Sequence, residues 1–267
     1  MFTEEYIKSQ IEALGIPDGA TVIMHTSLRA VGVIEGGAEC LLNLLIEQIT
    51  SHGGMLCVPT HTWSNLGTDN ITLDLTKAET NLGAFPSVAL QDPRGIRTDN
   101  PTHSMVVFGD DDRIREFVKG EINVKSPTSP ESCYGKLCRS NSYVLLVGVG
   151  QNSNTYLHFV EESLNLPNRM EKRTTPVCVK YPDGRVVHSE LYMFDESIHG
   201  DVSHKFYMYE PAFRAHGAIR DGMIGNAPVQ LCSTVRMRDC IELMASRAPG
   251  RDPLLADGEI PEAYYLI

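Results

Sequence analysis

Apolar and polar positions alternate along the first sixty residues in a way that predicts helices and strands in turn. Thr3 is followed by two glutamates and then by apolar residues at helical spacing, which predicts a helix that Gly15 ends. Gly36-Gly37 opens a second helix, expected over 38–49, with aliphatic side chains on one face. Short β-branched or apolar runs before and after this second helix predict strands. Helix and strand in alternation are typical of an α/β sheet.

Four apolar runs predict buried strands, because they are short and bounded by polar or glycine-containing turns. They cover residues 21–24, 55–59, 104–108 and 143–149. Two further strands, 177–181 and 185–189, are predicted as a hairpin from the Pro-Asp-Gly turn between them. Helices are expected over 154–164 and 234–247.

The segment 60–102 is different, since it is rich in Thr, Asn, Asp and Gly and shows little periodicity. A stretch of this length without an evident element is usually a functional loop or lid. Neither a repeat nor a low-complexity linker divides the chain, so we expect one domain over 1–267. The predicted fold is a single α/β domain with a central mixed sheet flanked by helices, long functional loops and a small β-hairpin elaboration.

The 267 residues include 23 Lys and Arg against 34 Asp and Glu, a formal net charge of −11. This charge argues against a nucleic-acid or anionic-membrane partner, since both need a basic face, and it permits a cationic partner. The seven cysteines are an odd number without a Cys-x-x-Cys pair, which favours a reducing cytoplasm over a disulfide framework. The first ten residues lack the apolar run of a secretory signal, and we expect a cytoplasmic protein.

The most specific local pattern is 147–161, where a buried strand ends in a glycine-containing loop and a helix begins near Asn154. Ligand sites of open α/β sheets lie at the carboxyl ends of strands. His158 and Glu161 are three residues apart and share a face of the predicted helix. A carboxylate near an imidazole raises its basicity, as a general base requires. A structural histidine near a solvated glutamate is the alternative, and spacing alone favours it.

The segment Thr26-Ser27-Leu28-Arg29, with Gly32, directly follows the first predicted strand. Its small polar residues offer backbone N–H groups and hydroxyls to a phosphate, and Arg29 adds charge. A polar strand-to-helix turn without a ligand is the alternative. Arg29-x-x-Gly32 partly matches the phosphate loop of the common N-acetyltransferase superfamily, but Ile34 stands where that loop needs Gly or Ala. We therefore do not expect that superfamily's fold.

Other chemistries find weaker support in the sequence. His61 and the segment 199–204 are conceivable metal ligands, but there is no His-Glu-x-x-His and no tight Cys/His cluster, so we expect no metal. No Gly-x-Ser-x-Gly marks a serine hydrolase. A cysteine nucleophile, Cys133 or Cys138 with a distant histidine, stays open, although buried cysteines are usually inert.

Six motifs, in order over roughly 20–165, together resemble the aminoglycoside 3-N-acetyltransferase family, and 219–239 is a weaker echo. The motifs are His25-Thr26-Ser27-Leu28-Arg29-Ala30-Val31-Gly32, Gly36-Gly37-Ala38, Val58-Pro59-Thr60-His61-Thr62, Asn100-Pro101-Thr102-His103-Ser104, Ser129-Pro130 with Gly135-Lys136-Leu137, and Leu146-Val147-Gly148-Val149-Gly150 with Asn154-Thr155-x-Leu157-His158-x-x-Glu161.

The resemblance implies an acetyl-CoA-dependent acyltransferase that acetylates the 3-amino group of aminoglycoside antibiotics and so gives resistance. It implies that His158 is the general base and Glu161 its partner. It also implies a CoA site built from the Thr26–Gly32 loop, the Thr60-His61 turn and Ser104.

The chemistry of amine acetylation sets further requirements. The site must remove a proton from an ammonium, hold the amine against the thioester carbon and stabilise the oxyanion. Thr60, Thr62 or a backbone N–H near Val149 are the candidate oxyanion donors, and the sequence does not choose among them.

A polycationic substrate needs carboxylates, for which acids in the loops are available. They are Asp69, Asp74, Asp99, Glu196 and Asp201. For any one of them, a solvated surface charge is the alternative. Acetyl transfer to a different amine, or a catalytically silent binding homologue, also stays open, as does the choice between monomer and homodimer.

Overall fold

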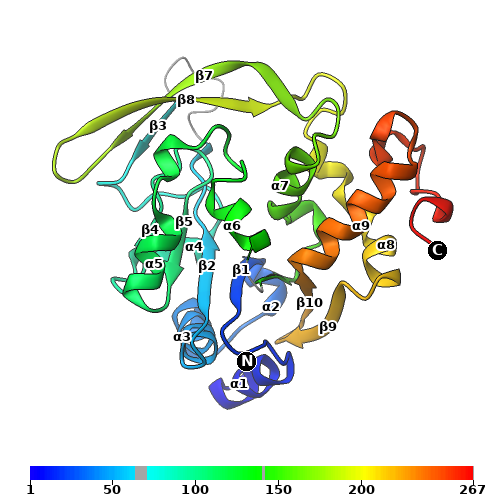
Figure 1. Ribbon diagram of the computed structural model, residues 1–267. Coiled ribbons are helices and arrows are strands. Elements are labelled where there is room, and N and C mark those ends of the chain that lie inside the picture. Colours follow the sequence, from blue (N-terminus) through cyan, green and yellow to red (C-terminus); the bar gives the residue numbers. More distant parts are fainter. Residues whose placement is uncertain (64–70, 140–141, 267) are drawn as a thin grey trace.

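A seven-stranded mixed sheet forms the centre of the molecule (Figure 1), with strand order β4-β5-β2-β1-β6-β10-β9. The computed structural model describes residues 1–63, 71–139 and 142–266. The strands of this sheet are β1 (Thr21–Thr26), β2 (Met55–Pro59), β4 (Ile96–Arg97), β5 (Met105–Phe108), β6 (Ser142–Val147), β9 (Ile219–Ile224) and β10 (Ala227–Ser233). β1 runs parallel to both β2 and β6, and the outer pairs are antiparallel.

Helices cover both faces of this sheet, which confirms the predicted α/β class. The helices are α1 (Glu4–Ala13), α2 (Leu28–Val31), α3 (Gly37–Thr50), α4 (Ala84–Gln91), α5 (Asp111–Val118), α6 (Cys133–Arg139), α7 (Tyr156–Ser163), α8 (Glu210–Ala215) and α9 (Thr234–Arg247). The short 3₁₀ segments η3 (Gln151–Ser153) and η4 (Val202–Tyr209) matter for the site. No helix among the described residues is long and apolar enough to cross a membrane.

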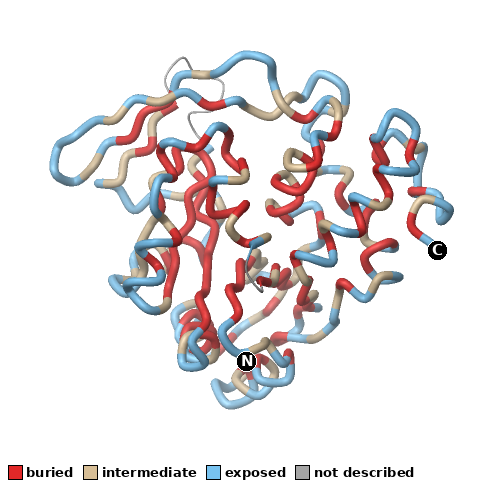
Figure 2. The backbone as a smooth tube through the Cα atoms, viewed as in Figure 1, coloured by how far each residue is buried: buried red, intermediate tan, exposed pale blue. Residues whose placement is uncertain are grey.

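Two apolar clusters, one on each face of the central sheet, form the main core. Figure 2 shows that buried residues follow the strands of this sheet. Successive side chains of a strand point to opposite faces, so Val22 and Met24 pack with α1, α3 and α4. Ile23, between them, packs on the other face with α6, α7 and α9. The continuous apolar runs of the sequence therefore belong to strands that are buried on both sides.

A second sheet has three strands in the order β3-β7-β8. It lies at the top of Figure 1, above the central sheet. It contains β3 (Ile71–Asp74), β7 (Met170–Lys180) and β8 (Val186–Phe194). The predicted hairpin is confirmed and is longer than expected, because β7 begins seven residues before Val177. Gly184, with φ of 86°, makes the turn.

The prediction that 60–102 lacks regular structure is wrong for the described part of that segment. β3, α4 and β4 all lie within it. These elements are short, and the partner of β3 is distant in the sequence, since Ile71 pairs with Val177 of β7. A local pattern does not report such pairing, because tertiary contacts rather than propensity stabilise it. Asp69 lies outside the described residues.

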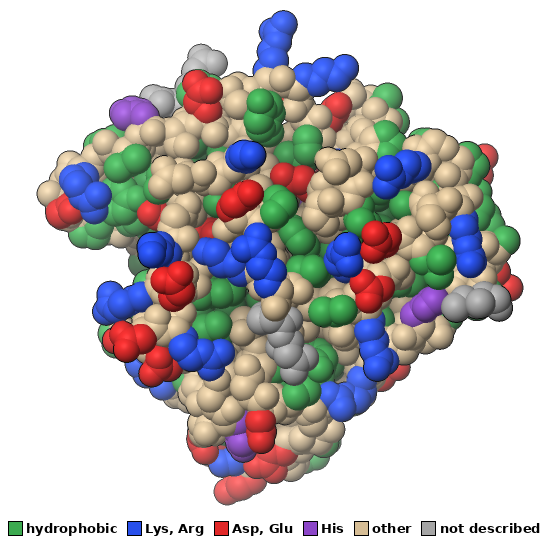
Figure 3. Space-filling view, in the orientation of Figure 1, with side chains coloured by type: hydrophobic (Ala, Val, Ile, Leu, Met, Phe, Trp, Pro, Cys, Tyr) green, Lys and Arg blue, Asp and Glu red, His purple; other side chains and the backbone are tan. Residues whose placement is uncertain are grey.

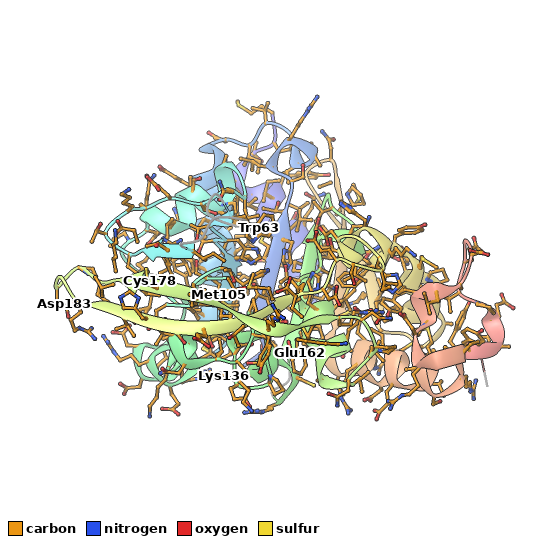
Figure 4. All side chains as sticks on the ribbon, turned by 90° about the horizontal axis from the view of Figure 1, so that it is seen from above. Trp63, Met105, Lys136, Glu162, Cys178 and Asp183 are labelled. Atoms are coloured by element: carbon orange, nitrogen blue, oxygen red, sulfur yellow. The ribbon has the colours of Figure 1, made fainter. Side chains whose placement is uncertain are left out.

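The parallel strands β1, β2 and β6 end at the same edge of the central sheet. The segments that follow them are 27–32, 60–63 and 148–154, so these segments meet there. Figure 4 looks down on this edge, with Trp63 near its centre and Asp183 at the tip of the hairpin. This is where ligand sites of open α/β sheets are found.

Candidate active site

A cavity of about 490 Å³ opens at this edge of the sheet. Its wall comes from the ends of β1, β2 and β8, from the approach to β5, and from the η3–α7 and η4 segments. The lining residues are His25, His61, Trp63, Leu82, His103, Asn152, Ser153, Asn154, Thr155, His158, Phe194, Asp195, Glu196, Gly200, Asp201, Val202, Ser203 and His204. Five histidines and two aromatic side chains thus surround a space that three carboxylates border.

His158 lies in the first turn of α7 and faces this cavity. Its ring stacks on Phe194, with centroids 4.2 Å apart, and meets Phe206 edge-on at 4.9 Å. Burial lowers the pKa of His158 to about 4, against the opposing effect of the Asp201 charge, which raises it. His158 is therefore neutral near pH 7, with a lone pair available to accept a proton, and Asp201 favours the imidazolium that would form.

The sequence predicts that Glu161 is the partner of His158, but the structure shows Glu161 bound to other residues. Its carboxylate is fully buried and accepts hydrogen bonds from Arg169 Nε at 2.5 Å and from the Tyr209 hydroxyl at 2.5 Å. Among the described residues, no hydrogen bond joins Glu161 to His158. Residues three apart on a helix differ by about 60° in direction, so one side chain can face the cavity while the other faces the core. The predicted direct pairing is therefore corrected.

Arg169 extends this contact into a buried network. Its guanidinium also donates to Asp252, at 2.7 and 3.0 Å, and Asp252 Oδ2 lies 2.8 Å from His199 Nε2. Burial disfavours the charged Asp252, but the hydrogen bond and charge of Arg169 outweigh it and lower the Asp252 pKa. The network joins α7, the start of β7, the C-terminal region and the segment that continues into Gly200 and Asp201. Glu161 thus holds the elements that carry His158 and Asp201.

Of the four predicted substrate-binding acids that the structure describes, two line the cavity and two do not. Glu196 and Asp201 border it. Asp74 instead accepts hydrogen bonds from the N–H and hydroxyl of Thr76 at the end of β3. Asp99 accepts a 2.5 Å hydrogen bond from the Tyr181 hydroxyl. The expectation that Asp74 and Asp99 bind substrate is not met, because both carboxylates are engaged outside the cavity.

Thr60 and Ser104, predicted to bind CoA, are fully buried and do not line the cavity. Their hydroxyls lie 3.2 Å apart, and Arg97 donates to Ser104 Oγ and to the carbonyl of Thr60. They connect the end of β2 to the start of β5, a structural role. His61, from the same turn as Thr60, does reach the cavity.

The Thr26–Gly32 loop is next to the cavity but not part of its wall. The Ser27 hydroxyl accepts from Ala30 N at 3.3 Å and caps α2, and the Ser27 N–H donates to Val147 at 2.9 Å. Gly148, with φ of 64°, packs so closely on this loop that a Cβ there would lie 2.4 Å from Ala30 Cβ. Most N–H groups of the loop are thus already hydrogen-bonded, whereas the Arg29 side chain is exposed.

The structure gathers around the cavity three residues to which the sequence assigned no chemical role, His25, Trp63 and His103, beside His61, which it assigned to the CoA site. His61 and His103 have ring centroids 4.4 Å apart, and Trp63 lies against both. Burial lowers the pKa of His103 to about 3 and that of His25 to about 4. His25 and His103 both belong to the motifs that resemble the family, but only the fold shows that they line the same cavity. No group of His, Cys, Asp or Glu suited to a metal ion occurs among the described residues.

This geometry defines a class: an α/β protein with neutral imidazoles and carboxylates around a cavity at the sheet edge, suited to proton transfer. The family model for aminoglycoside 3-N-acetyltransferase matches residues 23–245. The chain therefore belongs to this family of acyltransferases, and the predicted family is confirmed.

Relatives and solved structures agree. The SPbeta prophage-derived aminoglycoside N(3')-acetyltransferase-like protein YokD of Bacillus subtilis is 24% identical over 90% of this chain and 91% of its own length. Aminoglycoside acetyltransferase AAC(3)-IVa, solved as a histidine-to-alanine variant in complex with a gentamicin, has a TM-score of 0.77 at 22% identity, covering 93% of this chain and 90% of that one. AAC-IIIb with CoASH has a TM-score of 0.74 at 21% identity, covering 89% and 94%. These structures establish the fold, which is not that of the common N-acetyltransferase superfamily.

We expect Arg169→Leu to lower the free energy of unfolding by about 3–5 kcal/mol, because it leaves the buried carboxylates of Glu161 and Asp252 without their cation. Urea denaturation measures this change. Arg185→Leu is the control, since Arg185 pairs with Asp183 at the exposed hairpin turn and its loss should hardly matter. Equal stability of the two variants would contradict the importance of the network.

We expect the His158 resonance, followed by NMR, to titrate near pH 4 rather than near its ordinary value of 6.5. Asp201→Asn should lower this midpoint further, because a negative charge that favours the imidazolium is removed. Glu196→Gln is the matched control and should leave the midpoint unchanged. A midpoint near 6.5, or one that does not respond to Asp201→Asn, would show that the site is more hydrated than its geometry indicates.

Proposed function

We propose that this protein transfers the acetyl group of acetyl-CoA to the 3-amino group of an aminoglycoside, with His158 as the general base. Membership of the family supports the reaction. The observation that carries the role of His158 is its position: a neutral imidazole at the cavity wall, stacked on Phe194 and electrostatically coupled to Asp201. Glu161 is a positioning residue, which fixes α7 through Arg169 and Tyr209.

The arrangement suits the chemistry in a definite order. An ammonium does not attack a thioester, so the amine must first lose a proton, and His158 can accept it during attack. The imidazolium that forms is favoured by Asp201 and later returns the proton to the leaving thiolate. The cavity holds amine and thioester together, which converts a bimolecular step into an effectively unimolecular one.

Acetyl-CoA would enter along the Thr26–Gly32 loop. β1 and β6 are hydrogen-bonded neighbours, so this loop lies beside the segment that leads from Gly148 to the cavity-lining Asn152. The exposed guanidinium of Arg29 offers a charge to a phosphate. Because the N–H groups of Ser27, Val31 and Gly32 donate to carbonyl oxygens within the fold, we assign phosphate recognition to Arg29 rather than to a cradle of N–H groups.

The amine substrate would lie between the aromatic side chains Trp63 and Phe194, with its positive charges toward Asp201 and Glu196. For binding of a cationic substrate, the carboxylates at the cavity contribute more than the net charge of −11. On the face seen in Figure 3, Lys and Arg side chains are interspersed with Asp and Glu, so the long-range field is not uniformly negative there.

A second candidate is the same acetyl transfer to a smaller or less charged amine. The observation in its favour is that Asp74 and Asp99 are engaged outside the cavity, which leaves fewer carboxylates than the sequence had suggested. Thiol release from acetyl-CoA, measured with a panel of aminoglycosides and of small amines, separates the two candidates.

We expect His158→Ala to reduce kcat by about 10²- to 10⁴-fold, as is typical for loss of a general base, while the affinity for CoA stays close to that of the wild type. Thiol release measures turnover, and calorimetry measures CoA binding. His52→Ala, at an exposed position after α3, is the control and should behave as the wild type. Near-normal turnover of His158→Ala would remove His158 from the mechanism.

We expect Glu196→Gln to raise KM for a cationic aminoglycoside more than it lowers kcat, because this carboxylate attracts the substrate before and during reaction alike. Asp201→Asn should raise KM as well and also lower kcat, because it removes the charge that favours the His158 imidazolium. Asp74→Asn and Asp99→Asn are matched controls, and neither should change KM appreciably. Added salt should raise KM for the wild type through screening, over about 10 Å at 0.1 M. A larger effect at Asp74 or Asp99 than at Asp201 would refute this orientation of the substrate.

A further inference from the structure

Within the part of the chain that the structure describes, three polar atoms of cavity-lining side chains are buried without a hydrogen-bond partner: His25 Nε2, His61 Nδ1 and Asn154 Oδ1. Such atoms are rare in folded proteins, because a buried polar group that has lost water without gaining a hydrogen bond destabilises the fold. At the wall of a cavity, a group of this kind is explained by a ligand atom that completes its hydrogen bond. Of the two histidines, His61 is the more deeply buried, with only 1% of its surface exposed.

The other nitrogen of His61 is engaged in a way that bears on its proton. His61 Nε2 lies 2.8 Å from the hydroxyl of Tyr134, a fully buried residue of α6. Either group can be the donor in this contact, and a neutral imidazole carries a single N–H proton. When the Tyr134 hydroxyl donates to Nε2, that proton resides on Nδ1.

His61 is also held in place and held neutral. The Thr80 hydroxyl and the Asn81 N–H both donate to its carbonyl oxygen, at 3.1 and 3.0 Å. Its ring lies against those of Trp63 and His103. Burial, and then the neighbouring His103, His25 and His158, keep the pKa of His61 well below its usual value. The result is a rigid, neutral imidazole, and with its proton on Nδ1 it is the N–H donor that stabilisation of an oxyanion requires.

We propose that His61 Nδ1–H is the oxyanion donor of the acetyl transfer, and that Tyr134, by donating to Nε2, is the positioning residue that fixes its tautomer. This inference rests on the proposed function. The amine nitrogen forms a bond to the thioester carbon, and the carbonyl π pair moves to oxygen, where His61 Nδ1–H stabilises the charge. The amine proton passes to His158. Collapse of the intermediate restores the C=O bond, breaks the C–S bond and releases the thiolate, which takes the proton from His158.

This assignment differs from the donors that the sequence suggested. The Thr60 hydroxyl is buried against Ser104 and does not line the cavity. Thr62 and Val149 are absent from the cavity wall as well. His61, in contrast, borders the same cavity as His158, and the charges of the two imidazoles influence each other. A base and an oxyanion donor on one cavity are the two groups that acyl transfer to an amine needs.

The test is the infrared carbonyl band of bound acetyl-CoA labelled with ¹³C at the acetyl carbon. A hydrogen bond from His61 polarises this carbonyl, so in the wild type the band should lie at lower frequency than that of the free thioester. His61→Leu should return the band to the free position and lower kcat by about 10²- to 10³-fold with little change in KM. His61→Asn places an amide near the position of Nδ1 and should restore part of both effects.

Tyr134→Phe tests whether the hydrogen bond from Tyr134 to Nε2 fixes the tautomer of His61. This variant alone is sufficient for the test if His61→Leu does not fold. Without the Tyr134 hydroxyl the proton of His61 is free to move to Nε2, so the band should shift partway back and kcat should fall, with the titration of His158 unchanged. Tyr156→Phe is the matched control, because it also removes a buried tyrosine hydroxyl, which donates to the carbonyl of Thr234 at 3.2 Å. It should leave the band in place.

The outcomes separate this inference from the proposed function. If no bound thioester band appears in the wild type, acetyl-CoA is not a ligand and the proposed function fails. If a bound band appears at lower frequency and stays there in both His61→Leu and Tyr134→Phe, acetyl-CoA binds but another group polarises its carbonyl, and the assignment of His61 is overturned.

Discussion

The site depends on one buried interaction, the double ion pair of the Arg169 guanidinium with Glu161 and Asp252. The guanidinium holds these two buried carboxylates, and through them Tyr209 and His199. These groups come from segments that are far apart in the chain, so one cation fixes α7 relative to η4 and the C-terminal region. Because removal of the cation would leave two uncompensated charges in the core, the network has few alternative arrangements. The geometry of the cavity follows from this constraint.

The cavity that this network frames is unusual in its electrostatics. Imidazoles dominate its wall, and burial keeps His25, His103 and His158 uncharged, with pKa values of about 4, 3 and 4. Neutral imidazoles both donate and accept hydrogen bonds, so the same residue type serves as base and as donor at different positions. The few negative charges at the rim then act on a substrate without competition from cationic histidines. A cationic amine and a neutral base are thus compatible in one site.

Roles within the family motifs divide according to burial. Thr60 and Ser104 belong to the motifs that mark the family, but they bind each other and Arg97 and hold two strands together. His61 and His103, one residue away in each motif, face the cavity. Neighbouring residues of one motif thus differ in role, because one side chain is hydrogen-bonded within the fold while the next one reaches the cavity. A resemblance therefore identifies the segment more securely than the residue.

The sequence by itself determined the elements with strong local patterns: α1, α3 and α9, the apolar strands of the central sheet, and the hairpin turn. It also determined the family and the strand end at which His158 lies. Only the tertiary structure decided that Glu161 faces the core and not His158, and that Asp74 and Asp99 stay outside the cavity. It alone paired β3 with β7 and set the hydrogen bonds of His61. Local periodicity and spacing place residues along an element, whereas the direction and partner of each polar side chain depend on contacts between distant segments.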